Sequence, residues 1–185
     1  MNRRIREMTI SDVDLIVDYF LWSDNDYLKS LGVDIHKLPA KKEWGELILK
    51  ELQRPLEAKK LYYVIWEIDG KPVGHSHVNE IIFGGEAYMH LHLWRRGNRQ
   101  KGNGSFFVKQ SIAHYFEQLK LKTLFCQPYA LNPAPNKTLE SVGFRLIKNY
   151  ETIPSWINFR QSVNLWELTY AEFCRQNIFP PEPDR

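Results

Sequence analysis

The stretch from residue 86 to residue 119 constrains the fold most, because an alternating, strand-like segment runs directly into a basic glycine-rich loop and then into an apolar helical pattern. The loop contains Arg99, Gly102 and Gly104 in the order Arg-x-x-Gly-x-Gly. A loop of this kind at the start of a helix can turn several backbone N–H groups toward one point, where the helix dipole also favours negative charge. The junction therefore predicts a site for a phosphate-bearing ligand.

Two common nucleotide motifs do not fit this loop, since neither Gly-x-Gly-x-x-Gly nor a Gly-Lys-Ser/Thr ending is present. A second stretch, Asn132-Pro-Ala-Pro-Asn-Lys-Thr-Leu-Glu-Ser-Val-Gly-Phe144, has an Asn followed by a short helical segment that ends in Glu-x-x-Gly-Phe. Together and in this order, the two stretches resemble the pyrophosphate loop and the later signature of the GCN5-related N-acetyltransferase (GNAT) superfamily. The resemblance covers roughly residues 60 to 170 and is nearest in pattern to the ribosomal-protein N-terminal acetyltransferase-like branch.

This resemblance implies an α/β fold with a mixed, mostly antiparallel sheet of about six to seven strands and helices on both faces. In such a fold the strand before the phosphate loop and the next strand run parallel and splay apart, and the pantetheine arm of acetyl-CoA lies in the gap. The length of 185 residues suits a single domain over 1–185, with a proline-rich tail at 179–185 that we expect to be loose.

Composition excludes several classes of protein. Hydrophobic residues make up 43% of the chain and the formal charge is only +3, so neither a disordered chain nor a polycation is indicated. Cys126 and Cys174 are too few for a disulfide framework or a zinc motif, and the apolar runs are too short to span a membrane. We expect a cytoplasmic protein, monomeric or homodimeric, without nucleic-acid or membrane partners.

Periodicity and turn signals predict most of the elements. We expect strands at 4–7, 61–68, 72–82, 86–94, 122–126 and 161–168, another strand beginning at Phe144, and helices at about 11–20, 41–52, 104–119, 136–142 and 169–176. The segment 22–32 is either a loop or short helix over a binding cleft, or a solvated connector.

A turn centred between Gly84 and Gly85 would pair His77 with His92 and Asn79 with His90. Because side chains alternate across a strand, one face would then be apolar. The opposite face would carry His75, His77, Asn79, Tyr88, His90, His92 and Trp94. Four histidines on a face that a helix covers predict a cavity or water there.

The family resemblance implies the contacts with acetyl-CoA, the co-substrate. The pyrophosphate and pantetheine contacts would come from Leu91, Leu93, Arg99, Gln100, Lys101, Gly102, Asn103, Gly104, Ser105, Asn132 and Asn136. For the general base we favour His92, then His90, with Glu86 nearer the start of the strand, because an unperturbed His has a pKa near 6.5. Purely structural roles for these histidines stay open. The amine pocket is predicted from Trp22, Asp24, Asp26, Tyr27, Trp44, His77 and Tyr88, whose acids would suit a cationic amine.

A metal is the alternative use of the histidines, since zinc takes about four nitrogen or sulfur ligands. The His-x-His pairs lie flat along a sheet and the family needs no metal, so we predict none.

The chain departs from the family pattern where many members have a Tyr that protonates the leaving thiolate. Leu139 stands at that position, and Pro135 replaces the Ser of the ribosomal-protein branch. Tyr129, Asn136, Thr138 or water remain as sources of the proton.

The sequence thus predicts an acetyl-CoA-dependent N-acetyltransferase that acts on a primary amine of a small molecule or a peptide N-terminus. The alternatives on the same fold are a catalytically silent acyl-CoA sensor and a nucleic-acid binder that uses Arg95, Arg96, Arg99 and Lys101.

Overall fold

Seven strands form one sheet in the order β1-β2-β3-β4-β5-β7-β6, in a computed structural model that describes residues 1–94, 97 and 102–176. The strands are β1 (Arg3–Glu7), β2 (Leu61–Ile68), β3 (Lys71–Asn79), β4 (Glu86–Leu93), β5 (Thr123–Cys126), β6 (Arg145–Thr152) and β7 (Gln161–Thr169). The helices are α1 (Val13–Leu21), α2 (Asn25–Ser30), α3 (Lys41–Leu52), α4 (Asn103–Gln118), α5 (Pro133–Ser141) and α6 (Tyr170–Arg175). The predicted α/β fold with a mostly antiparallel sheet is confirmed; the predicted loose tail lies outside the described residues.

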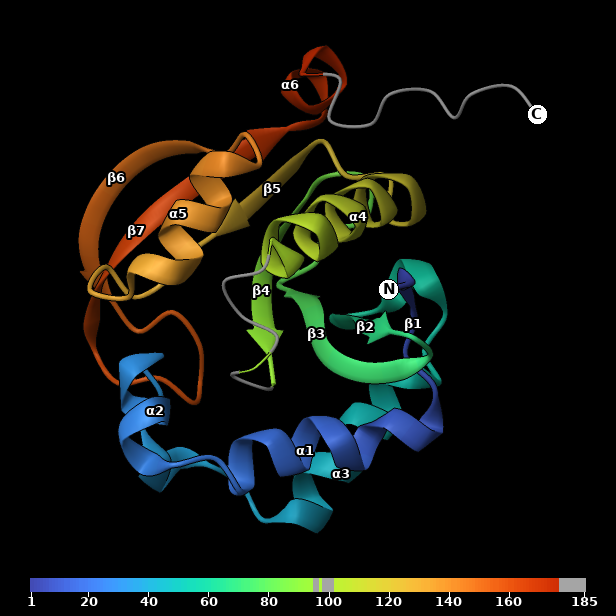
Figure 1. The fold of residues 1–185 in the computed structure, drawn as a ribbon, viewed down its shortest axis with the longest axis vertical. Helices are drawn as coiled ribbons and strands as arrows, with labels where there is room; N and C mark the ends of the chain where they lie inside the picture. Colours follow the sequence, from blue (N-terminus) through green and yellow to red (C-terminus); the bar gives the residue numbers. More distant parts are fainter. Residues whose placement is uncertain (95–96, 98–101, 177–185) are drawn as a thin grey trace.

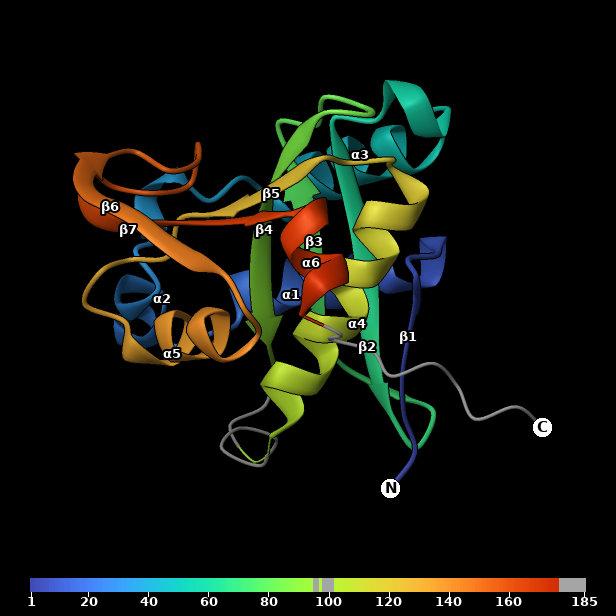
Figure 2. The ribbon, with the colours of Figure 1, turned by 90° about the horizontal axis from the view of Figure 1, so that it is seen from above.

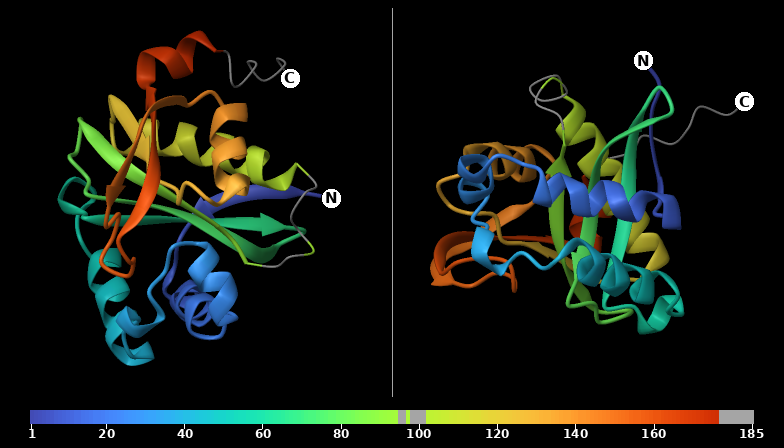
Figure 3. Two further views of the ribbon diagram at one scale, coloured as in Figure 1. Left: turned by 90° about the vertical axis from the view of Figure 1, so that its left-hand side faces the viewer. Right: turned by 90° about the horizontal axis from the view of Figure 1, so that it is seen from below.

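Helices cover both faces of the sheet (Figure 3). Strand β2 shows the consequence, because Tyr62 through Glu67 are all buried and its sequence is almost continuously apolar. Val64 and Trp66 enter the core beneath α4 and α5, whereas Tyr63 and Ile65 enter the core beneath α1 and α3. Among the described residues, no helix combines the length and apolarity that a bilayer crossing requires.

Strands β4 and β5 run parallel but pair over only three residues each, Glu86–Tyr88 with Thr123–Phe125. Beyond them the strands diverge, as Figure 1 shows. At the point of divergence the buried Cys126 thiol donates to the Met89 carbonyl oxygen at 2.8 Å. The predicted splayed pair is therefore confirmed.

The predicted register of the β3–β4 hairpin is wrong by two residues. His77 lies opposite His90, and His75 lies opposite His92. The strand ends early because Glu80 adopts a left-handed conformation with φ of 50°. The loop then closes through the Ile82 N–H, which donates to the Glu86 carbonyl at 2.8 Å. A shift of two residues preserves the faces, so the four histidines still share one side.

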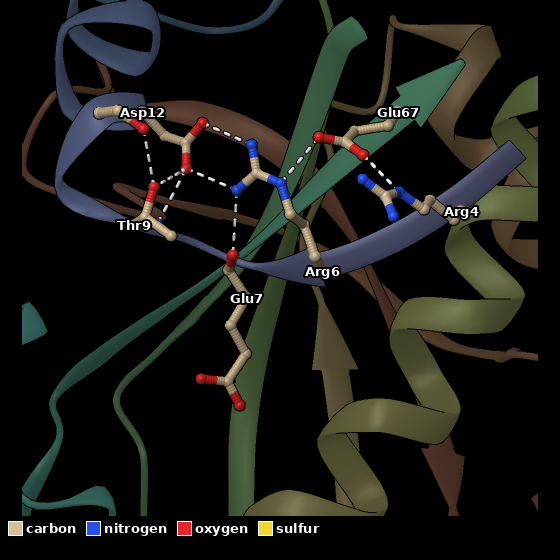
Figure 4. Close-up of polar contacts among 7 residues, drawn as sticks. Arg4, Arg6, Glu7, Thr9, Asp12 and Glu67 are labelled. Carbon is tan, nitrogen blue, oxygen red and sulfur yellow. Dashed lines mark hydrogen bonds and ion pairs between the residues drawn. The ribbon is translucent and has the colours of Figure 1, made fainter. Parts of the chain in front are cut away.

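The start of α1 is fixed to the sheet by a network of charges (Figure 4). The Arg6 guanidinium donates to both carboxylate oxygens of Asp12, at 2.6 and 2.8 Å, and to Glu67 at 2.7 Å. Arg4 donates to the other oxygen of Glu67 at 2.6 Å. Burial, the largest single effect, would raise the pKa of both carboxyl groups. The hydrogen bonds from Arg6, Arg4 and Thr9 and the attraction of the two guanidinium groups together outweigh it, so both pKa values lie below their usual range. The network holds α1, and with it Phe20, over the histidine face of the sheet.

Strands β6 and β7, with α5 and α2 beside them, form one end of the molecule (Figure 2). The loop that joins the two strands reaches the segment after α2, where the Asp34 N–H donates to the Ile157 carbonyl at 2.8 Å. The Asn158 side chain donates to the Gly32 carbonyl at 2.8 Å. These contacts place residues 154–158 beside the open ends of β4 and β5.

Candidate active site

A cavity of about 300 Å³ joins the gap between β4 and β5 to the histidine face. Its floor comes from Met89, His90, Leu91 and His92 on β4 and from His77 and Asn79 on β3. The remaining lining residues are Phe20, Leu31, Val33, Trp44, Lys60, Leu61, Tyr63, Cys126, Gln127, Pro128, Tyr129, Asn132, Pro135, Pro154, Ser155, Trp156, Ile157, Asn158 and Gln161. The cavity expected on the histidine side of the sheet is therefore present.

The four histidines stack on one another across the two strands. The ring centroids of His77 and His90 are 4.5 Å apart, and those of His75 and His92 are 4.8 Å apart. Phe20 of α1 packs on His92 with its centroid at 5.1 Å. Burial lowers the pKa of His90 to about 4; burial and the neighbouring His90 lower that of His92 to about 3. Near neutral pH these rings are uncharged and can accept protons.

His90 has its protonation pattern fixed by Asn79. The Nε2 atom of His90 lies 3.1 Å from the Asn79 amide oxygen. Because an amide oxygen only accepts, His90 carries its proton on Nε2 and keeps a lone pair on Nδ1. A neighbour that holds an imidazole in one tautomer is the arrangement expected for a general base.

His75, His77 and His92 are the residues that could hold a metal, since one nitrogen of each lies within 4.8 Å of the others. However, the Trp94 indole N–H donates to Nδ1 of His75 at 2.8 Å, so the neutral ring carries its proton on Nε2. A metal on Nδ1 would displace Trp94, and a metal on Nε2 would move the ring proton to Nδ1, against the indole N–H. The cluster fits neutral rings better than ligands, and the absence of a metal stays a prediction.

The predicted phosphate loop leads into α4 at Gly102, which has a φ of 71°. Among the described residues, no side chain caps this helix, and the first helical hydrogen bond runs from the Phe106 N–H to the Gly102 carbonyl at 3.2 Å. A Cβ atom added at Gly102 would have no atom of the described residues within 4 Å. The first turn can therefore offer main-chain donors to an anion, as acetyl-CoA requires.

Apart from Asn132 and Asn136, the other predicted cofactor residues lie on β4, at the start of α4 or outside the described residues. The Asn103 side chain is buried and accepts from Arg3 at 3.4 Å. Leu91 lines the cavity, whereas Leu93 lies farther along β4. Gly104 and Ser105 form the first turn of α4. Arg99, Gln100 and Lys101, with Arg95 and Arg96, lie outside the described residues.

Asn132 and Asn136 take different roles at the start of α5. Asn132 caps the helix by accepting from the Ala134 N–H at 3.3 Å, and it lines the cavity. The Asn136 amide donates to two carbonyl groups and accepts from Asn164 at 2.9 Å and Trp166 at 2.8 Å. Asn136 thus clamps the loop onto β7, and its contact with the cofactor remains a prediction.

Tyr129 is the one of the three suggested proton donors that lines the cavity. Thr138 donates to a carbonyl within α5, and Leu139, where many relatives have a Tyr, is fully buried. Tyr129 comes three residues after the end of β5 and bridges to Val163 of β7.

Most of the residues predicted for the amine pocket do not line the cavity. The Asp24 carboxylate caps α2 by accepting from the Asp26 and Tyr27 N–H groups at 3.0 Å each. Trp22 is 80% exposed, and Tyr27 bonds to the Tyr19 hydroxyl at 2.8 Å. Of the remaining predictions, His77 lines the cavity, Tyr88 stacks on Phe125, and Glu86 lies at the paired end of β4.

On the aromatic side of the cavity, sequence reasoning offered Trp44 but missed Phe20 and Trp156. Phe20, Trp44 and Trp156 come from α1, α3 and the loop between β6 and β7. Only long-range packing brings these segments together. Trp156, which is 56% exposed, carries no local sequence pattern that marks it as a pocket residue.

A family model described as "Acetyltransferase (GNAT) domain" matches residues 3–145. The chain belongs to the GNAT acetyltransferase family. This GNAT chain is accordingly an N-acetyltransferase that takes its acetyl group from acetyl-CoA. No curated protein matches it in sequence.

Solved structures of GNAT enzymes share the fold. A spermidine N-acetyltransferase from Vibrio cholerae in complex with CoA and spermine is 16% identical, with a TM-score of 0.76 over 93% of this chain and 98% of that one. The aminoglycoside acetyltransferase AAC(6')-Ib in complex with coenzyme A is also 16% identical, with a TM-score of 0.74 over 95% of this chain and 99% of the other. At this identity the likeness establishes the fold alone.

Proposed function

We propose that this GNAT enzyme transfers the acetyl group of acetyl-CoA to the primary amine of a small molecule by direct attack. The observation that carries the proposal is the cavity, because it connects the gap between β4 and β5 with a base-bearing sheet face. The amines named with the solved relatives, spermine and kanamycin, support an amine acceptor. A peptide N-terminus, which the resemblance to the ribosomal-protein branch suggests, is the second acceptor class.

Backbone groups of the protein would make most of the contacts with acetyl-CoA. The first turn of α4, from Asn103 to Ser105, would bind the pyrophosphate together with Arg99, Gln100 and Lys101. The pantetheine arm would pair with main-chain groups of β4 near Leu91 and Leu93, on the side from which β5 has diverged. The bound thioester supplies the acetyl electrophile.

His90 is our choice for the general base, ahead of His92, because Asn79 fixes its tautomer. The acceptor must arrive as a neutral amine, and its nitrogen becomes strongly acidic as the C–N bond forms. A base with a pKa of about 4 can then take the proton. The C–S bond then breaks, and we assign protonation of the departing thiolate to the Tyr129 hydroxyl because Tyr129 lines the same cavity.

The test compares two variants of Gly102. Both Gly102→Glu and Gly102→Ala pay about 1–2 kcal/mol for placing a side chain at positive φ, so their difference reports on the ligand. We expect the Glu variant to bind acetyl-CoA about 100-fold or more weakly, since a carboxylate would face the pyrophosphate. The Ala variant should stay within about tenfold of the parent. Parental affinity in Gly102→Glu would refute the assignment of the loop.

Leu139 and Pro135 replace both customary proton donors, which is the observation that suggested a silent acyl-CoA sensor as the alternative to an enzyme. Steady-state release of CoA across a panel of amines distinguishes the two. Tight acetyl-CoA binding without release of CoA for any amine would favour the sensor.

A further inference from the structure

An aromatic wall runs from the sheet floor to the mouth of the cavity. Phe20 packs on His92, Trp44 packs on Phe20 with centroids 5.0 Å apart, and Trp156 meets Trp44 edge-on at 5.8 Å. Trp44 is 5% exposed whereas Trp156 is 56% exposed, so the wall leads outward from the core. We define the aromatic wall as Phe20, Trp44 and Trp156.

The charge of the lining is as distinctive as its shape. Among the described residues that line the cavity, Lys60 is the one charged side chain, and the other polar groups are histidines, amides and hydroxyls. Burial lowers the pKa of the three lining histidines, which keeps them neutral. The two acids predicted for the amine pocket do not line the cavity: Asp24 caps α2, and Asp26 lies in an exposed pair with Lys29 at 3.9 Å.

A lining of this kind selects between classes of amine. Spermine and aminoglycosides carry several ammonium groups, and each group that leaves water without an anionic partner costs binding energy. An aromatic wall instead stabilises a flat apolar body and can attract one ammonium group over a ring face. Lys60 adds attraction for an anionic substituent on that body.

We propose that the acceptor is an amine with a single basic nitrogen on an aromatic or otherwise apolar body, lying along the aromatic wall, and that polyamines are excluded. The inference rests on the proposed function, since it names the acceptor of the same site. Lys60 extends the class to amines that also carry a carboxylate.

Two sets of amines test the proposal with the full chain and acetyl-CoA. One set holds 2-phenylethylamine, tryptamine and phenylalanine, and the other holds spermidine and kanamycin. We expect kcat/KM for the best member of the first set to exceed that for either polycation by about 100-fold. A preference for spermidine or kanamycin would overturn the inference and leave the proposed function standing.

Equilibrium binding keeps the inference testable where turnover is absent. Binding of the same amines to protein saturated with CoA measures the selectivity without acetyl transfer. Weak binding of the aromatic amines together with tight binding of a polycation, or no binding of any of these amines, would overturn the inference. Failure of every amine to release CoA despite selective binding of the aromatic set would instead contradict the proposed function alone.

Two pairs of variants assign the selectivity to named side chains. Trp156→Ala should raise KM for 2-phenylethylamine about tenfold. Its control, Tyr170→Ala, removes a similarly exposed aromatic ring, 50% exposed on α6, and should leave KM unchanged. Lys60→Glu should weaken the binding of phenylalanine and strengthen the binding of spermidine, whereas Lys42→Glu on the outer face of α3 should change the binding of neither. Equal effects within either pair would refute the role given to the wall or to Lys60.

Discussion

Removing the charge of Arg6 should destabilise the fold strongly. In Arg6→Met the apolar stem is kept, but Asp12 and Glu67, which are 2% and 3% exposed, lose their shared partner. Leaving a buried charge uncompensated costs about 3–5 kcal/mol. We take the lower limit, because Arg4 still bonds to Glu67 and the Thr9 N–H still donates to Asp12 at 2.8 Å.

A loss of about 3 kcal/mol corresponds to a Tm about 6–12 °C lower for a chain of this length. Urea unfolding at pH 7, followed by circular dichroism, measures the free energy directly. The matched control is Lys41→Met, since Lys41 contacts Asp18 at 2.7 Å on the surface and such exposed pairs contribute little.

The pH dependence gives a second check on the same network. The folded-state pKa values of Asp12 and Glu67 are lowered, so the stability they contribute is present above their unfolded pKa values near 4 and is lost as the pH falls through the lower folded values. The difference between the parent protein and Arg6→Met should therefore shrink below about pH 4. A loss below about 1 kcal/mol at pH 7, or one no larger than that of Lys41→Met, would show that the network does not hold α1.

Three further predictions concern the site and its surroundings. His90→Gln should lower kcat about 100-fold or more, while the Kd for acetyl-CoA stays unchanged. Because the pKa of His90 is about 4, the kcat of the parent enzyme should show no histidine inflection between pH 5 and 8. An inflection near pH 6.5 would contradict the buried neutral ring. Gly74→Ala should lower the free energy of unfolding in urea by about 1–3 kcal/mol, since the new Cβ would lie 2.5 Å from the His92 carbonyl oxygen. Unchanged stability would mean that β3 and β4 are not this close. A thiol reagent should label only the exposed Cys174 in the native protein and both cysteines after unfolding. The reason is that Cys126 is buried and its pKa is raised to about 12. Two labels on the native protein would contradict this.

Elements with strong local signals were predictable. The helix from Lys41 to Leu52 follows from its apolar period, and the strands around Asp69-Gly70 follow from the turn. The hairpin register was not predictable, because it depends on Glu80 leaving the strand in a left-handed conformation that few residues other than glycine adopt.

The acceptor side of the site was the least predictable part. Acids beside a Trp in the segment 22–32 suggested a pocket for a cation, but the same Asp24 is also a good helix cap, and the structure uses it that way. Trp156 reaches the cavity only because the loop between β6 and β7 bonds to Gly32, a contact across 126 residues of sequence that no local pattern encodes. The histidine face was predictable because its side-chain alternation survives a shift of two residues.

The short pairing of β4 with β5 divides the sheet into two leaves, β1 to β4 and β5 to β7, that share a seam of three residue pairs. A ligand that forms hydrogen bonds along the open part of that seam would act as an added strand and link the two leaves. Ligand binding should therefore stiffen the whole sheet. Amide hydrogens on both sides of the seam should exchange more slowly with solvent when the ligand is bound.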